Sequence, residues 1–349
     1  MRFIFFISIM IVLNTIATGN NNAFCQPNNS VFFEIQIDEN IKEVPYLIIE
    51  NHLIDEPELR LEKDRIIQPY KCKGNIYFFD LQDIDEPSYF SMLVNSKESG
   101  SYVLKDYHYE PGDNVEIKVT ADSKMQEYDI DFSGIGSGKY RCVSELQYRL
   151  SHLKSQGIAV FAPDGVYIGK NSYNLNLGML KDAVEKYRPE ISEYSYSLLS
   201  ADIKAQQEKI LVAAFHQQMY NTLTTNDETS YLKAAAAYRL HFRCGMETEI
   251  PDSIKYKSRE YAGYILDKLV TDYLEKYTRI NFISVYNAIK KIHPAILSDK
   301  VLVHLFLKHS MDMKEDYRML MDVALKSVKN PACKHALGLL SDYGPASVL

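Results

Sequence analysis

The stretch YDIDFSGIGSGKYRCVSEL, residues 128–146, has different hydrophobic periods on the two sides of a glycine cluster. In residues 128–132 apolar and acidic side chains alternate, which is typical of a half-buried strand. From Lys139 onward the apolar side chains recur at the spacing of a helix face. We therefore expect a β-rich unit to end and a helical unit to begin here, with a hinge formed by Gly134, Gly136 and Gly138.

The same glycines invite comparison with a phosphate-binding loop. That loop needs a glycine five residues before the Gly-Lys pair and a Ser or Thr after it, but Ser133 and Tyr140 occupy these positions. The dinucleotide-binding fingerprint fails as well, because Lys139 stands where its third glycine is required. The sequence predicts no nucleotide and no other cofactor, and the glycines are interpreted as a sharp turn.

The part before the glycines predicts an antiparallel β-sandwich or barrel-like domain at residues 26–138. In NVEIKVT (114–120), for example, apolar and polar residues alternate. Pro111 and Gly112 suit the central positions of a type II turn, so we expect a hairpin around EPGDN (110–114). The other predicted strands are 31–37, 46–50, 75–81, 89–94, 102–109 and 128–132.

The part after the glycines predicts an all-α helical bundle or array at residues 139–349, so the expected fold class is α+β. Pro251, Pro294 and Pro331 fall at the boundaries of the expected helices rather than inside them. Beyond the first helix, the predicted helices are 175–191, 193–222, 229–244, 256–277, 281–293, 296–311, 314–329 and 331–342.

Residues 1–25 have the order of a secretory signal peptide. Arg2 precedes an apolar run, and Ala23 and Cys25 are small residues suited to cleavage before Gln26. The alternative is a lipoprotein with a lipid anchor at Cys25. No later segment approaches the roughly 20 apolar residues of a membrane helix. We expect an exported protein of the periplasm or cell envelope without a transmembrane helix in its mature chain.

Charge is distributed unequally between the two parts. Residues 26–135 contain 23 acidic and 10 basic residues, whereas residues 136–349 contain 23 acidic and 28 basic residues. A net charge of −13 in the first part and +5 in the second indicates two units with different surfaces. Nucleic acid is not an expected partner, because its phosphates require a basic face.

The mature chain contains four cysteines, Cys72, Cys142, Cys244 and Cys333, at spacings of 70 residues or more. An oxidising compartment permits disulfides. Buried free thiols are one interpretation, and a single bridge from Cys142 to Cys244 or Cys333 is the other. The nine histidines form no metal-binding motif, so no metal ligands and no catalytic residues are assigned.

The acidic strands with YHYEPGDNVEIKV (107–119), the junction DFSGIGSGKYRC (131–142) and the tyrosine-rich helices together resemble a known family. They are similar to the N-terminal region of exported TlpA/ResA-like thiol-disulfide oxidoreductases of Bacteroidota-type bacteria, in which a β-rich domain and a helical segment precede a thioredoxin domain. That family's reaction uses a W-C-x-x-C motif. This chain has no tryptophan and no C-x-x-C, so no catalytic residue is transferred to it.

The resemblance implies an exported, non-catalytic accessory or binding protein, with protein partners in the cell envelope and without the thioredoxin domain. Two alternatives remain at this point. One is a redox protein that uses cysteines outside a C-x-x-C motif. The other is an envelope lipoprotein that binds a glycan or peptide through its many tyrosines, of which the chain has 26.

Overall fold

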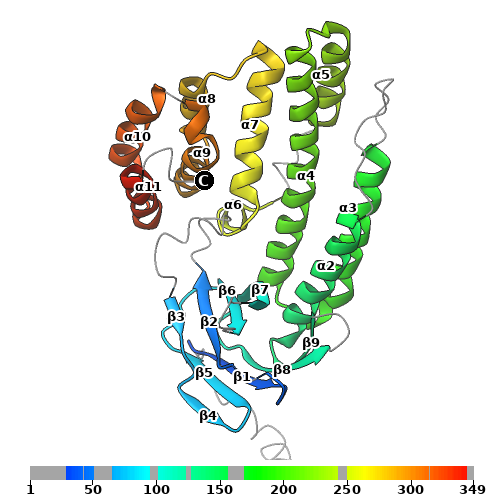
Figure 1. The fold of residues 1–349 in the computed structure, drawn as a ribbon, viewed down its shortest axis with the longest axis vertical. Coiled ribbons are helices and arrows are strands. Elements are labelled where there is room, and N and C mark those ends of the chain that lie inside the picture. The colour runs from blue at the N-terminus through cyan, green and yellow to red at the C-terminus, as the bar shows by residue number, and fades with distance from the viewer. Residues whose placement is uncertain are drawn as a thin grey trace, which may run out of the picture.

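The computed structural model describes residues 29–41, 43–50, 65–94, 101–122, 127–155, 169–242, 250–313 and 315–343. The expected signal peptide, with Cys25, and also Cys244 lie outside the described residues. Within them the chain has nine strands followed by ten α-helices, which confirms the α+β class. The strands lie at one end of the molecule and the helices extend away from them (Figure 1).

The strands form two sheets. The five-stranded sheet has the order β4-β5-β1-β8-β9, and the four-stranded sheet has the order β3-β2-β6-β7. The two sheets face each other across a shared core, in which the Phe33 and Phe90 rings have their centroids 4.9 Å apart. The strands are β1 (Val31–Ile37), β2 (Pro45–Glu50), β3 (Arg65–Ile67), β4 (Lys71–Lys73), β5 (Ile76–Leu81), β6 (Ser88–Val94), β7 (Ser101–Tyr109), β8 (Asn114–Asp122) and β9 (Glu127–Ile135).

One pairing differs from the expected antiparallel pattern. Strand β1 pairs with β8 in parallel, with Phe33 opposite Val115, whereas the other pairings between described strands are antiparallel. The alternation of buried side chains along β1 is the same for either orientation of its neighbour. The direction of this pair was therefore not visible in the sequence.

The expected hairpin around EPGDN was wrong, although the turn itself is present. Gly112 has a φ of 89°, and the Asp113 N–H donates to the Glu110 carbonyl at 3.1 Å, as in a type II turn. However, β7 pairs with β6 and β8 pairs with β1 and β9. The turn thus carries the chain from the four-stranded sheet to the five-stranded sheet.

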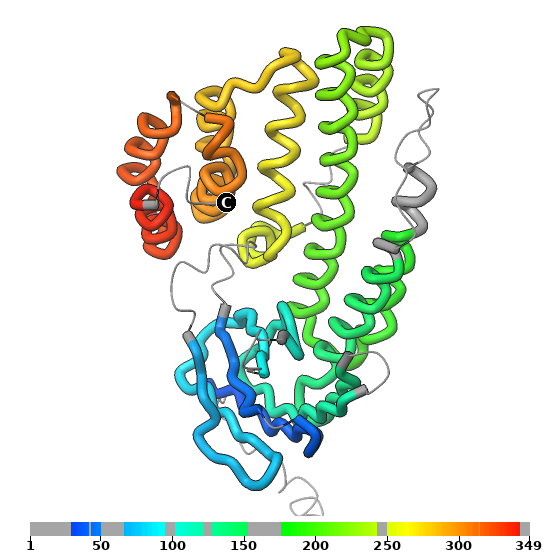
Figure 2. The backbone as a smooth tube through the Cα atoms, viewed as in Figure 1, coloured from blue at the N-terminus to red at the C-terminus, as the bar shows by residue number. Residues whose placement is uncertain are grey.

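The helices begin directly after β9. Helix α4 has 32 residues, so it is about 48 Å long, and it runs from the β half to α5 at the far end (Figure 2). The helices are α2 (Ser137–Ser155), α3 (Gly169–Tyr187), α4 (Glu193–Thr224), α5 (Glu228–Phe242), α6 (Asp252–Lys255), α7 (Tyr261–Tyr277), α8 (Phe282–Ile289), α9 (Ala295–Met313), α10 (Asp316–Ser327) and α11 (Pro331–Tyr343), with the 3₁₀ turn η2 (Arg188–Glu190) after α3.

Hydrophobic packing continues across the expected domain boundary at residue 138. The core between the sheets also contains Tyr140 and Leu146 of α2, Leu180 of α3 and Leu199 of α4. A second large core joins α7, α8, α9, α10 and α11. The change from strand to helix lies at residue 136, and helices α2, α3 and the first part of α4 pack with the strands. Among the described helices, none is both long enough and apolar enough to cross a bilayer.

The three junction glycines have separate roles. Gly134 lies in β9 with a φ of 92°, and a Cβ there would overlap the Asn114 carbonyl. Gly136, with a φ of 86°, is the single residue between β9 and α2. Gly138 lies inside α2, where a Cβ would be 2.7 Å from the Glu190 Cβ. The expected sharp turn is therefore at Gly136, where the positive φ can be adopted without strain only by glycine.

We expect Gly136→Ala to lower the free energy of unfolding by roughly 2–4 kcal/mol, because alanine is strained at positive φ and its Cβ would overlap Asp113. Gly178→Ala is the matched control. Gly178 lies inside α3, and a Cβ added there would meet no atom within 4 Å, so the change should stabilise the protein by roughly 0.5–1 kcal/mol. Urea unfolding followed by circular dichroism measures both, and equal effects would contradict this account.

Candidate functional site

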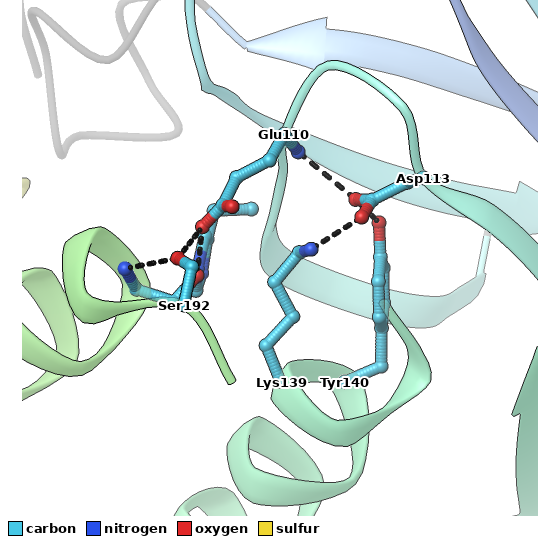
Figure 3. A network of polar contacts seen from close by, with 7 residues as sticks. Glu110, Asp113, Lys139, Tyr140 and Ser192 are labelled. Carbon is cyan, nitrogen blue, oxygen red and sulfur yellow. Dashed lines mark hydrogen bonds and ion pairs between the residues drawn. The ribbon is translucent and has the colours of Figure 1, made fainter. Parts of the chain in front are cut away.

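The residues around the junction converge on the buried carboxylate of Asp113. The Lys139 Nζ donates to Oδ1 at 2.5 Å, the Tyr140 hydroxyl donates to Oδ2 at 2.8 Å, and the Glu110 N–H donates to Oδ2 at 2.9 Å. Figure 3 shows these three donors around Asp113. Asp113 is 5% exposed and Lys139 is 4% exposed. The lysine that suggested a phosphate site is therefore an internal ion-pair partner.

The local sequence explains how these side chains meet. Asp113 follows Gly112, whose φ is positive, and precedes β8. Its contacts with Lys139 and Tyr140 place it beside the start of α2. Lys139 and Tyr140 are consecutive residues in the first turn of α2. Gly136 leaves room for Asp113 Oδ1, which a Cβ would displace. The conformation of two turns thus brings one acid and two donors together.

Burial sets the protonation chemistry of this group. Loss of water raises the pKa of the Asp113 carboxyl, while the Lys139 ammonium and the hydrogen bonds act to lower it. Burial and the Asp113 charge also raise the pKa of Tyr140, so this hydroxyl remains a donor. A buried pair of this kind contributes little net stability, but removal of one partner leaves an uncompensated buried charge.

A second set of contacts joins the same turn to α4. Glu110 Oε1 accepts hydrogen bonds from the hydroxyls of Ser192 (2.7 Å) and Ser195. Ser192 is the N-cap of α4, and its Oγ accepts from the Ser195 N–H at 2.9 Å. His108 Nε2 lies 2.7 Å from Ser195 Oγ. The start of α4 is thereby attached to the end of β7.

The grouping of Ser195, His108 and Glu110 differs from a catalytic triad in the direction of its hydrogen bonds. The Ser195 hydroxyl donates its proton to Glu110, so His108 Nε2 must be the donor to Ser195. In a triad the serine would donate to the histidine. Ser195 is 0% exposed and His108 is 2% exposed, so no substrate can reach them. The arrangement positions α4 and does not activate a nucleophile.

Asp202, in the first third of α4, connects this helix to two other parts of the chain. Its carboxylate accepts from the Tyr89 hydroxyl of β6 at 2.9 Å, from the Ser258 hydroxyl at 2.5 Å and from the Arg259 N–H at 3.1 Å. The Arg259 guanidinium forms an ion pair with Asp106 of β7. Ser258 and Arg259 lie between α6 and α7. This cluster therefore connects the helices beyond α4 to the four-stranded sheet.

The three described cysteines do not form a disulfide and lie in different environments. Cys72 is exposed on β4, Cys142 is buried in the core shared by the sheets and α2, and Cys333 is buried in the core of the last helices; all three are free thiols. Burial raises the pKa of both Cys142 and Cys333 to about 12. The alternative bridge between Cys142 and Cys333 is thus not formed. A bridge to Cys244 lies outside the described residues.

The remaining predicted assignments concern metals and the hinge. No group of three or more His, Cys, Asp or Glu side chains in the described ranges is arranged to hold a metal ion. Sequence reasoning identified Gly134, Gly136 and Gly138 but missed Asp113, which it had placed in a simple hairpin. A usable signal was the acid-rich EPGDN turn after an aromatic strand, because an acid so placed needs a partner when it is buried.

We expect Lys139→Met to lower the free energy of unfolding by about 3–5 kcal/mol, because the Asp113 carboxylate loses its buried cation. Arg141→Met is the control: Arg141 and its partner Glu190 have side chains 43% and 46% exposed, so its loss should cost less than about 1 kcal/mol. Combining Lys139→Met with Asp113→Asn should recover part of the loss. Chemical denaturation measures all three, and similar costs for Lys139 and Arg141 would refute a buried ion pair.

His108 should make the protein sensitive to mild acid. Burial lowers the pKa of His108 from 6.5 to about 3, with Lys139 contributing. Because the folded pKa lies below the unfolded value, this stability is present above pH 6.5 and is lost as pH falls toward 3. Between pH 7 and pH 5 the wild type should lose about 2 kcal/mol more than His108→Gln. The free energy of unfolding measured at both pH values tests this prediction, with His335→Gln at an exposed position as control. If His108→Gln loses as much stability between pH 7 and pH 5 as the wild type, His108 is not the cause of the acid sensitivity.

Comparisons of the chain with protein-family models, with curated proteins and with solved structures find no match.

Proposed function

We propose that this protein is an exported, non-catalytic accessory protein that binds another protein of the cell envelope. The proposal includes its similarity to the N-terminal region of TlpA/ResA-like reductases. It rests first on the sequence features of that resemblance, namely the acidic strands, the turn at Gly112 and the glycine junction at Gly136.

The single observation that carries the proposal is that the side chains at the junction with potential catalytic chemistry are buried and serve as internal contacts. Asp113, Lys139, His108 and Ser195 are each buried and each hydrogen-bonded to another part of the chain. Groups with these contacts hold strands and helices in a fixed relation. A rigid frame of this kind favours binding or presentation of a partner, since it preserves the shape of the binding surface.

The redox alternative requires at least one reactive cysteine that is accessible to solvent. Disulfide exchange proceeds through an accessible thiolate. Cys142 and Cys333, with pKa values raised to about 12, are protonated at neutral pH and enclosed in separate cores. Cys72 is exposed, but it is not bridged to another described cysteine. These properties support a binding role over thiol exchange.

We expect iodoacetamide at pH 8 to label Cys72 in the native protein within minutes, and to label Cys142 and Cys333 only after unfolding, because both are buried. Mass spectrometry of the digested protein identifies the labelled sites. In the same preparation, insulin reduction by dithiothreitol should not be accelerated. Acceleration that is lost in any one of Cys72→Ser, Cys142→Ala or Cys333→Ala would replace the binding role with the redox role.

Binding is tested by chemical cross-linking in cells that export the protein. We expect one envelope protein to be recovered that also binds the purified chain in a two-component measurement with a micromolar or tighter dissociation constant. Lys139→Met, which loosens the junction, should weaken this binding, whereas Arg141→Met should not. Failure of the purified components to associate would refute the proposal.

A further inference from the structure

A pocket of about 310 Å³ lies among the helices, and its lining includes none of the residues of the junction contacts. Its walls come from α6, α7, the end of α8 with the segment that follows it, and the start of α9. The volume is at the lower end of the roughly 300–1,000 Å³ range of ligand sites. Such a pocket can hold a small molecule rather than a protein segment.

The charged lining of the pocket has a single sign. Its charged lining residues are Lys255, Lys268 and Lys291, and none of its lining residues is acidic. The part of the chain that forms the pocket, residues 136–349, also has a net positive charge of +5. The lysine ammonium groups therefore provide a positive local potential that favours an anion.

Two of these lysines are partly removed from water. The side chains of Lys255 and Lys268 are 13% and 21% exposed. Each pairs at 2.9 Å with an acid one helical turn away, Asp252 and Asp272, whose side chains are 59% and 39% exposed and do not line the pocket. The acids hold the two ammonium groups in place and offset part of their charge, but each ammonium has three N–H donors and so keeps donors for a further anion.

The rest of the wall is apolar and rigid. Tyr261, Ile265 and Leu297 line the pocket and belong to the core of the last helices, where they are at most 8% exposed. Leu269 and Ile292 extend this surface. An inorganic phosphate would leave these apolar side chains without a ligand group to pack against. A ligand with an apolar body and one anionic group matches both parts of the lining.

We propose that this pocket binds a small organic carboxylate, with an aliphatic or aromatic body against Tyr261, Ile265 and Leu297 and its carboxylate near Lys255, Lys268 and Lys291. The site is separate from the junction contacts and does not depend on the proposed role in protein binding.

Octanoate is the test ligand and octan-1-ol is its uncharged counterpart. Titration calorimetry and ligand-observed NMR on the mature chain should show saturable octanoate binding with a dissociation constant of about 1 mM or tighter, consistent with a ligand of this size. Octan-1-ol should bind at least about tenfold more weakly, because it lacks the charge that the lysines attract.

Variants locate the site. Lys255→Gln with Lys291→Gln should weaken octanoate binding about tenfold by removing two cations. Ala288→Leu should weaken it by a similar factor by filling the pocket, since Ala288 lines it. Lys334→Gln, at an exposed position on α11, is the matched control and should change nothing. Thermal unfolding confirms that each variant is folded.

Three results would overturn the proposal. Absence of saturable octanoate binding would exclude the site, and equal affinity for octan-1-ol would exclude its preference for anions. An equal loss in Lys334→Gln would mean that octanoate responds to overall charge and not to the pocket. Each of these results leaves the protein-binding role untouched, because that role is measured with a protein partner.

Discussion

The arrangement of strands and helices depends on the buried ion pair between Asp113 and Lys139. Its two residues come from the turn that crosses between the sheets and from the first turn of α2. An acid and a base with about 5% of each side chain exposed must be paired, because neither can be hydrated. The observed placement of α2 against the sandwich satisfies this requirement and also buries Tyr140, whose hydroxyl donates to Asp113. The pair therefore specifies geometry more than it adds stability.

Helix α4 connects the β half to the remaining helices and fixes their positions. Its N-cap Ser192 is bonded to Glu110, and Asp202 is bonded to Tyr89 of β6 and to Ser258 before α7. These contacts lie at different heights along one helix, so the helix cannot tilt without breaking one set. The helices that pack on α4, including α5 and α7, are positioned relative to the sheets through it.

The buried polar groups also explain why residue types associated with catalysis need not indicate an active site. Ser195, His108 and Glu110 have the composition of a triad, yet the hydrogen-bond direction and the burial serve to hold α4. Lys139 has the position of a phosphate-loop lysine, yet its ammonium is satisfied by Asp113. In the helical half, Lys255, Lys268 and Lys291 line the pocket beside α7, where a ligand can reach them.

Local periods could be predicted from the residues alone: alternation predicted β1 at residues 31–37, helical spacing predicted α7 and α11, and the glycines marked the change between them. These features depend on neighbours within a few residues. The short elements β3, β4 and α6 were missed because three or four residues carry no period. Only the tertiary structure shows that β1 is parallel to β8, that the turn at Gly112 connects the two sheets, and that Asp113 is the partner of Lys139. Each of these is a choice of partner across distant parts of the chain, which packing of the whole core selects and local sequence does not encode.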